Sequence, residues 1–280
     1  MAFHSETLVR ELSRRAQRLR ILALQMIYEA QSGHPGGSLS AAEIVAALYF
    51  HQLRLNPQQP DWPDRDRFIL SKGHSAPVYY AALAEAGILP AETLKSFRKL
   101  HCVLQGHPDR TKTPGVDMSS GPLGNGLSVG VGLALSGRLR GAPYRTYVLL
   151  GDGELDAGLI WEAAMLANKY KVGTLTAIVD YNGVQLAGAV QDVMPLEPLA
   201  DKWRAFGWRP FEIDGHNMRA ILEALDACAG IHGQPTVIIA HTIKGKGVSF
   251  MEGRYTWHSG PPNAEQFQQA MRELQEGMPQ

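Results

Sequence analysis

An acidic turn and an asparagine have the residue types and the spacing of a metal–phosphate site. Gly151-Asp152-Gly153 directly follows an apolar run, and Asn182 closely follows the next run, 182 − 152 = 30 residues after Asp152. One strand–helix–strand unit has this length and would bring both side chains to the same edge of a sheet. Carboxylate and amide oxygens suit Mg²⁺, which usually keeps phosphate oxygens and waters as further ligands. The alternative is a strand-to-helix turn with a capping aspartate.

Two further features of this turn favour a phosphate ligand over a plain turn. Gly153 lets the backbone approach a ligand closely. The N-terminus of a helix that follows would attract an anion. Together with Asn182 at the right distance, these features predict a metal–diphosphate site.

Other polar clusters also follow apolar runs. In open α/β sheets, ligands bind outside the carboxyl ends of the strands, so clusters of this kind would share one edge. The clusters are Ser71-Lys72-Gly73-His74, Asp180-Tyr181-Asn182-Gly183, Asp214-Gly215-His216 and His241-Thr242. Their convergence is stronger evidence for a site than any one motif.

The elements that would position these clusters alternate along the chain. Apolar runs predict strands at 66–70, 146–150, 175–179, 208–213 and 237–240. Helical patterns and caps predict helices from Ser5 to about 26, at 40–52, 75–87, 90–100, 124–139, 157–170, 196–206 and 217–230, and after Asn263. Continuous apolar strands that alternate with helices indicate an α/β fold, with helices on both faces of a parallel sheet. Residues 1–280 are expected to form one domain.

Composition excludes several classes of protein. Lys+Arg and Asp+Glu are both 27, so the formal net charge is 27 − 27 = 0, which argues against a nucleic-acid-binding surface. No apolar run approaches the roughly 20 residues of a membrane span. The two cysteines, Cys102 and Cys228, form no disulfide framework and fit a reducing, cytoplasmic compartment.

Glycine-flanked histidines extend the pattern. They occur in Ser32-Gly33-His34-Pro35-Gly36, Ser71-Lys72-Gly73-His74 and Gly106-His107-Pro108. Two glycine-rich segments accompany them, Gly121-Pro122-Leu123-Gly124-Asn125-Gly126 and 243–249. The spacing Gly124-x-Gly126-x-x-x-Gly130 only loosely matches a dinucleotide fingerprint and follows a loop, so it indicates close helix packing.

These motifs, in this order, resemble transketolase, and specifically the N-terminal chain of a split transketolase. The resemblance covers residues from about 5 to 262. It implies the thiamine diphosphate-binding fold and, as cofactors, thiamine diphosphate with Mg²⁺, or Ca²⁺ or Mn²⁺ in its place. The implied activity is transfer of a two-carbon ketol unit from a ketose phosphate to an aldose.

The resemblance also implies roles for particular residues. Asp152, Asn182 and the carbonyl of Val184 would ligate the metal. The residues expected to contact the cofactor are His74, Gly121, Leu123, Gly153, Asn182 and His258. His34, His107 and His258 would face the substrate as catalytic residues, since ketol transfer needs repeated proton movement near neutral pH. His216 is more typical of a helix start, and His241 of a strand end near the site, than of a site residue.

The sequence departs from the family at two places, and the family's second half is expected elsewhere. One departure is Asp180-Tyr181-Asn182, where many relatives have paired asparagines, although the ligand position is kept. Many relatives have a glutamate, directed at the dimer interface, where this sequence has Ala157, next to Asp156. The pyrimidine-binding domain, which supplies the glutamate that activates the cofactor, is expected on a separate C-terminal subunit. The chain is therefore expected to be inactive alone and to form a heterotetramer with that partner, without nucleic acid or membrane.

Two alternatives remain at the level of sequence. One is a subunit similar to 1-deoxyxylulose-5-phosphate synthase or to decarboxylases of 2-oxoacids. The motifs Gly106-His107-Pro108 and Gly121-Pro122-Leu123-Gly124 favour transketolase over both. The other is a non-catalytic subunit that binds the cofactor for regulation or assembly. The identity of the sugar donor and acceptor does not follow from the sequence.

Overall fold

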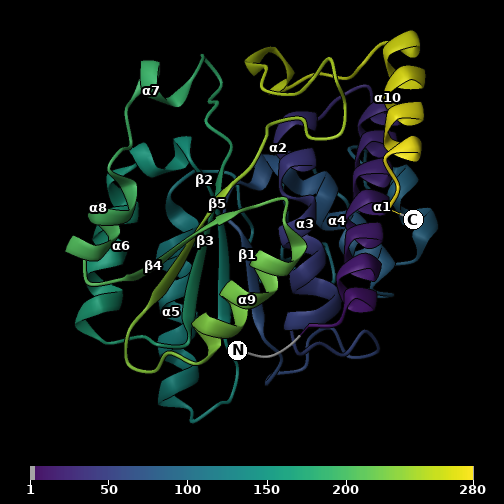
Figure 1. Cartoon of the computed structure of the whole chain (residues 1–280). Coiled ribbons are helices and arrows are strands. Elements are labelled where there is room, and N and C mark those ends of the chain that lie inside the picture. The colour runs from purple at the N-terminus through teal and green to yellow at the C-terminus, as the bar shows by residue number, and fades with distance from the viewer. Residues whose placement is uncertain (1–3, 280) are drawn as a thin grey trace.

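A single five-stranded parallel sheet forms the centre of the computed structural model, which describes residues 4–279 (Figure 1). The strands have the order β1-β2-β3-β5-β4, and neighbouring strands are parallel throughout. Their bounds are β1 Arg67–Leu70, β2 Thr146–Gly151, β3 Leu175–Tyr181, β4 Arg209–Asp214 and β5 Thr236–His241. The predicted fold class, a parallel sheet in an α/β protein, is therefore confirmed.

Helices cover both faces of the sheet. The α-helices are α1 Glu6–Ala30, α2 Pro35–Ser40, α3 Ala42–Ala47, α4 Ala76–Glu85, α5 Asn125–Leu139, α6 Gly158–Lys169, α7 Val190–Val193, α8 Leu199–Ala205, α9 Met218–Ala229 and α10 Ala264–Glu276. Short 3₁₀ or π turns lie at Leu48–Gln52, Gly73–Ser75, Ala91–Ser96, Gly153–Asp156 and Tyr255–Trp257. None of the described helices is both long enough and apolar enough to cross a membrane.

The strand residues alternate between two cores, because successive side chains of a strand point to opposite faces. Tyr147 and Leu149 of β2 join a core with α1, α3, α4 and α9, whereas Val148 and Leu150 join a core with α5, α6 and α8. Strands β2, β3 and β5 are buried on both faces, which explains their continuous apolar sequences, whereas the edge strand β4 is largely exposed or half-buried. This two-sided packing fixes the register of the strand ends that bear the polar clusters.

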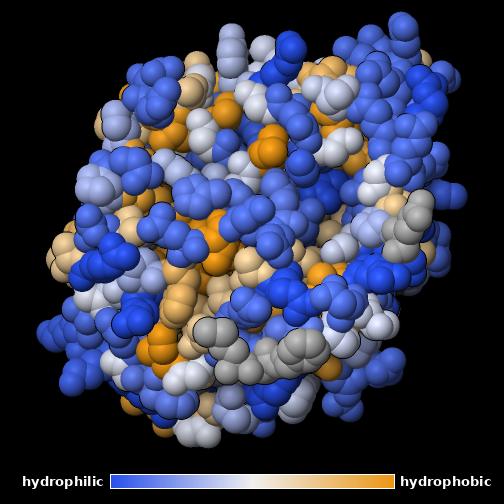
Figure 2. Space-filling model, viewed as in Figure 1, coloured by the Kyte–Doolittle hydropathy of each residue, from blue (hydrophilic) through white to orange (hydrophobic). Residues whose placement is uncertain are grey.

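The C-terminal part of the chain returns to the first helix. After β5, a long segment crosses to α10, which lies beside α1 (Figure 1). Leu24 of α1 and Leu274 of α10 share a third apolar cluster, and Tyr28 stacks on Phe267 with ring centroids 3.9 Å apart. In the same view, hydrophilic side chains cover the outer side of α10, while apolar ones gather near the middle of the face (Figure 2).

Some predicted elements differ from the structure. The strands and the helices at 124–139, 157–170 and 217–230 are present within a few residues of their predicted bounds. The predicted helix at 90–100 is wrong: only a 3₁₀ turn, Ala91–Ser96, forms, because Leu94 is its one buried residue. Between the first two predicted helices, α1 continues to Ala30 and Pro35 begins the short helix α2, so the glycines after Pro35 are helical. The predicted single domain includes residues 1–3 and 280, which lie outside the described residues.

Candidate active site

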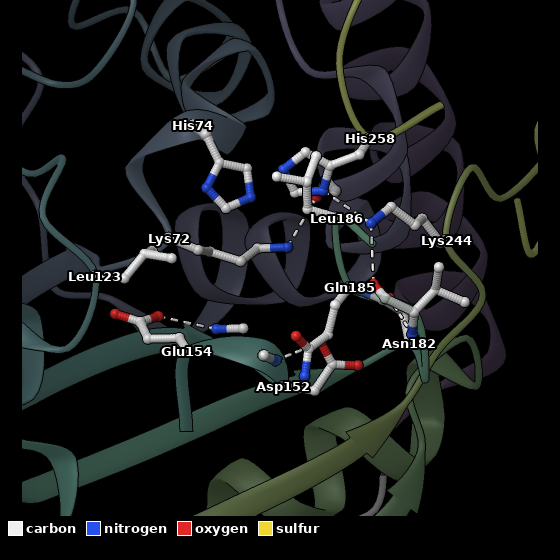
Figure 3. A pocket seen from close by; sticks show the side chains of 14 residues that line it. Lys72, His74, Leu123, Asp152, Glu154, Asn182, Gln185, Leu186, Lys244 and His258 are labelled. Carbon is white, nitrogen blue, oxygen red and sulfur yellow. Dashed lines mark hydrogen bonds between the residues drawn. The ribbon is translucent and has the colours of Figure 1, made fainter. Parts of the chain in front are cut away.

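A pocket of ≈190 Å³ opens at the carboxyl ends of the strands (Figure 3). Its wall combines acidic, basic and imidazole side chains with apolar residues at the rim. The lining residues are Gly37, Lys72, His74, Leu123, Gly151, Asp152, Gly153, Glu154, Asn182, Val184, Gln185, Leu186, Lys244 and His258. The clusters after β1, β2 and β3 therefore converge on one site, whereas Asp214-Gly215-His216 and His241-Thr242 contribute no lining residue, so the predicted convergence of all the clusters is wrong for these two.

Oxygen atoms from the ends of β2 and β3 gather on one side of the pocket. Asp152 is 3% exposed, and its carboxylate accepts hydrogen bonds from the backbone N–H groups of Gly153, at 2.8 Å, and Gly183, at 2.7 Å. Asn182 Oδ1 accepts from the N–H of Val184 at 3.2 Å. These bonds fix the turn after β3 against the turn after β2, as the spacing of Asp152 and Asn182 predicts.

Four histidines form a cluster beside these oxygens. The ring of His34 lies 5.2 Å from that of His74, 5.5 Å from that of His258 and 6.4 Å from that of His107. His74 and His258 are 5.1 Å apart. Nδ1 of His34 is buried and has no hydrogen-bond partner among residues 4–279.

Two buried lysines separate the acidic and imidazole sides (Figure 3). Lys244 Nζ donates to the carbonyl of Val184 at 2.9 Å and to Nδ1 of His258 at 3.0 Å. Lys72 Nζ donates to the carbonyl of Gly37 at 2.9 Å and forms an ion pair with Asp180. The Lys72–Asp180 pair is fully enclosed, since neither side chain is more than 2% exposed.

Burial makes the charged forms of several site groups unfavourable. Burial, together with the positive charge of Arg98, lowers the pKa of His34 to about 4. Burial and the ammonium of Lys244 lower the pKa of His258 to about 4. Burial lowers the pKa of Lys244 itself to about 8. The imidazoles are therefore neutral at pH 7, and each presents one donor and one acceptor nitrogen.

Burial shifts the pKa of Asp152 in the opposite direction, because the charged form of a carboxylate is the deprotonated one. Burial, followed by the negative charge of Asp180, raises the pKa of Asp152 to about 6. Burial also acts to raise the pKa of Asp180, but its ion pair with Lys72 and its hydrogen bonds from Ser40 and Thr242 together lower it. Of the two carboxylates at the ends of β2 and β3, only Asp152 lacks an ion-pair partner among the described residues.

All ten residues that the sequence analysis singled out lie at this edge of the sheet. Seven line the pocket: His74, Leu123, Asp152, Gly153, Asn182, Val184 and His258. His34 and His107 adjoin it through the histidine cluster, and Gly121 faces the ring of His107. His241 lies apart from the pocket, where it is 3.5 Å from Glu212.

The sequence analysis missed several pocket residues. Glu154 is buried and accepts hydrogen bonds from Ser71 Oγ and from the N–H groups of Gly124, at 2.8 Å, and Gly151, at 3.0 Å. Lys72 lies in a cluster that was recognised, but its partner Asp180 follows another strand. In the sequence, Glu154, Lys72 and Asp180 are marked only as charged residues close to a strand end, a pattern too common to predict a site by itself.

Ala157, which the sequence analysis identified as a departure from the family, lies near the acidic turn at the edge of the pocket. Ala157 packs close to Gly124, where a Cβ on the glycine would approach the Cβ of Ala157 to 2.8 Å. Asp156 Oδ2 accepts a hydrogen bond from Gln185 Nε2 at 3.0 Å. Asp156 therefore fixes a residue of the pocket wall.

The donor groups fit the implied metal and cofactor. Within residues 4–279, no three His, Cys, Asp or Glu side chains gather in a metal-binding arrangement. A hard cation with phosphate ligands needs fewer protein groups, and the carboxylate of Asp152 with neighbouring amide and carbonyl oxygens is such a set. Lys244 supplies positive charge beside these oxygens, whereas the charge of Lys72 is paired with Asp180. The pocket thus combines oxygen ligands for a cation with an ammonium group that can contact an anion.

Comparison with known proteins gives a consistent result. Residues 12–278 match the family described as "Transketolase, thiamine diphosphate binding domain". The chain is 44% identical over 265 residues to the 6-deoxy-6-sulfo-D-fructose transketolase subunit SqwG of Clostridium sp. (strain MSTE9), covering 95% of this chain and 96% of that protein. It is 41% identical over 268 residues to an apulose-4-phosphate transketolase subunit of Phocaeicola vulgatus, covering 96% and 95%.

Longer relatives match over part of their length. Human transketolase is 41% identical over 264 residues, which are 92% of this chain and 41% of that protein. The crystal structure of transketolase from Campylobacter jejuni superposes with a TM-score of 0.90 at 34% identity, covering 94% of this chain and 42% of that one. The chain thus spans about two fifths of these longer proteins and nearly all of the two subunits.

Proposed function

Because this chain belongs to the transketolase family, in its thiamine diphosphate-binding domain, we propose that it is the N-terminal subunit of a split transketolase. It would transfer a two-carbon ketol unit from a ketose phosphate to an aldose, and only together with a separate C-terminal subunit. The observation that carries this proposal is the pocket that brings Asp152 and its neighbouring oxygens together with two lysines and two histidines, beside which His34 and His107 lie. Residues 1–280 would form one diphosphate-binding domain.

The residues that would hold the cofactor follow from the donor groups. Asp152, Asn182 and the carbonyl of Val184 would ligate Mg²⁺, and Lys244, which contacts that carbonyl, would lie beside the diphosphate. His74, Gly153 and His258 would contact the diphosphate, while Gly121 and Leu123 would lie against the thiazolium. The cofactor would supply an electron sink for cleavage of the carbon–carbon bond next to a ketose carbonyl.

The histidines would move and hold protons. His34, His107 and His258 would face the hydroxyls and the reacting carbonyl of the sugar. Their pKa values lie below the usual range because the rings are buried, so they enter the reaction neutral and able to accept a proton. A bound diphosphate would favour the protonated forms and bring these pKa values closer to neutrality, where proton transfer is most effective.

The rim of the pocket supports a separate partner. Leu123 and Leu186 line the pocket but are 47% and 64% exposed. Apolar side chains beside a polar site are commonly covered in the working assembly. We propose that the partner's pyrimidine-binding domain covers them, in a heterotetramer with two copies of each chain. The free thiols of Cys102 and Cys228 suit the reducing cytoplasm.

The test is ketol transfer with purified proteins. The chain would be assayed alone and with the product of the adjacent gene, in the presence of thiamine diphosphate and Mg²⁺. Donors would be xylulose 5-phosphate, for a role in pentose phosphate metabolism, 6-deoxy-6-sulfo-D-fructose and apulose 4-phosphate, with ribose 5-phosphate as one acceptor. We expect turnover only from the pair and loss of turnover in Asp152→Ala. Full activity of the isolated chain would contradict the split arrangement.

A further inference from the structure

His216 follows the edge strand β4 and is the best-connected histidine outside the pocket. Its backbone N–H donates to Asp214 Oδ1 at 2.9 Å, which closes the turn after the strand. Its side chain is only 13% exposed, and its two ring nitrogens contact different elements. Nδ1 lies 3.1 Å from Glu43 Oε2 of α3, and Nε2 lies 2.8 Å from the backbone nitrogen of Ile243.

These two contacts define which ring nitrogen carries the proton. The N–H of Ile243 can only donate, so Nε2 of His216 must be the unprotonated acceptor. Nδ1 then carries the hydrogen and donates it to the carboxylate of Glu43. Glu43 is itself held by an ion pair with Arg20 of α1, and both side chains are at most 10% exposed. The ring is therefore locked in one tautomer and one orientation.

The peptide that His216 contacts lies directly before a pocket residue. Ile243 precedes Lys244, whose ammonium reaches Val184 and His258 inside the pocket. The side chain of Ile243 is 37% exposed, so burial does little to anchor this residue. Thr242 is fixed to the end of β3, because its N–H donates to the carbonyl of Tyr181. The hydrogen bond from Ile243 to His216 is the next attachment along the chain.

The turn after β4 is shaped for this contact. Gly215 donates to the carbonyl of His241 at 2.8 Å, which continues the β4–β5 pairing one step beyond the strands. A Cβ on Gly215 would lie 2.4 Å from Cγ2 of Thr242, so only glycine allows the two turns to approach this closely. Where backbone pairing ends, the imidazole of His216 takes the place of a carbonyl as the acceptor.

We propose that His216, oriented by Glu43, is a positioning residue that holds the segment 242–244 and thereby places Lys244 in the cofactor pocket. His216 does not line that pocket and contacts neither Lys244 nor any proposed metal ligand. Its effect is transmitted through one peptide group. This inference rests on the proposed function, since it assumes that the pocket binds thiamine diphosphate.

Two substitutions separate the contacts of the ring. In His216→Gln, the side-chain oxygen can reach the place of Nε2 and still accept from Ile243, but the contact with Glu43 is lost. In His216→Asn, the shorter amide can reach Glu43 but not Ile243. The exposed His232, for which the structure shows no side-chain hydrogen bond, provides the matched control His232→Asn.

The experiment has one readout that needs no cofactor and one that does. Hydrogen exchange at the Ile243 amide is measured in the full chain, and the Kd for thiamine diphosphate is measured with Mg²⁺ by calorimetry on the complex with the C-terminal partner. We expect His216→Asn to speed exchange at Ile243 and to raise the Kd roughly tenfold, the usual effect of one lost hydrogen bond. His216→Gln should keep both values within about threefold of the wild type, and His232→Asn should change neither.

The outcomes that would overturn the inference are distinct from failure of the proposed function. Unchanged exchange and Kd in His216→Asn, or equal damage in His216→Gln, would overturn the positioning role. If His216→Asn does not fold, ¹⁵N NMR of the wild type decides: we expect the Nδ1–H tautomer and a coupling from the Ile243 amide to Nε2, and the Nε2–H tautomer overturns it. A wild-type complex with the C-terminal partner that binds no thiamine diphosphate would contradict the proposed function, while exchange at Ile243 would still test the contact.

Discussion

The carboxylates of Asp152 and Asp180 stand at the ends of neighbouring strands, yet they have different tasks. Asp180 is neutralised by Lys72 and accepts further hydrogen bonds from Ser40 and Thr242, so it is a structural anion. Asp152 faces the pocket without such a partner, and burial raises its pKa to about 6. A buried carboxylate that is poorly compensated by the protein is a natural ligand for a cation. The sequence singled out Asp152 by its spacing from Asn182, but it did not show that Asp180 is paired with Lys72.

The histidine cluster predicts a division of labour between His74 and His107. His74 lines the pocket, whereas His107 reaches it only through His34. We expect His74→Gln to raise the Kd for thiamine diphosphate about tenfold. We expect His107→Gln to lower kcat/KM for the ketose by about 10²–10⁴ and to leave that Kd within twofold. Calorimetry and steady-state kinetics of the assembled enzyme measure the two effects; a large change in Kd for His107→Gln would contradict the assignment.

The lowered pKa values of the buried histidines predict a dependence of stability on pH. Between about pH 6.5 and pH 4, His34 binds more protons in the unfolded chain than in the folded one, so folding is destabilised as the pH falls through this window. We expect the Tm of the cofactor-free chain to fall by several degrees less in His34→Gln than in the wild type between pH 7 and pH 5. Thermal unfolding monitored by circular dichroism tests this. His232→Gln is the control, and parallel behaviour of His34→Gln and wild type would refute the prediction.

At the scale of elements, the sequence predicted what depends on local pattern and missed what depends on contacts between distant segments. The apolar runs of 146–150 and 175–179 predicted β2 and β3, and their separation placed Asp152 near Asn182. The resemblance supplied His34 and His258, which no spacing rule connects. Lys72 with Asp180, and His216 with Ile243, could not be paired in advance. Each pair joins the ends of different strands or loops, and the partner is set by strand order rather than by sequence distance.

The glycines of α5 predict opposite effects of the same substitution. A Cβ at Gly130 would lie 2.5 Å from Cγ2 of Val148, whereas a Cβ at the exposed Gly132 would meet no atom within 4 Å. Gly130→Ala should therefore lower the free energy of unfolding by about 1–3 kcal/mol through overpacking. Gly132→Ala should raise it by up to about 1 kcal/mol, because alanine favours the helix. Urea denaturation of the isolated chain measures both, and equal changes in the two variants would argue against close packing of α5 on the sheet.

At the scale of the whole molecule, the pocket lies open at one edge of the sheet. Leu123 and Leu186 expose apolar surface at its rim, and the chain corresponds to about two fifths of the longer transketolases that it resembles. The four histidines and the acidic turn are already arranged by this chain alone. A partner would therefore complete a preformed half-site rather than induce it.

The exposed leucines at the pocket rim predict which substitutions weaken association with the partner. Leu186→Glu places a charge on the proposed contact surface, and we expect it to weaken association with the C-terminal partner by at least tenfold. Leu139→Glu is the matched control, because Leu139 is 86% exposed and lies at the C-terminal end of α5, away from the pocket. Sedimentation without cofactor measures association directly. An unaffected complex in Leu186→Glu would place the partner elsewhere.

The packing of α10 against α1 has a consequence for when the protein can bind its cofactor. His34 follows α1, whereas His258 lies in the segment that leads to α10, and the two rings are only 5.5 Å apart. During synthesis, the first ring emerges more than two hundred residues before the second, and the apolar cluster that holds the late segment requires Ala270 and Leu274. A growing polypeptide on the ribosome thus carries only part of the site. We therefore expect thiamine diphosphate to bind after translation has finished.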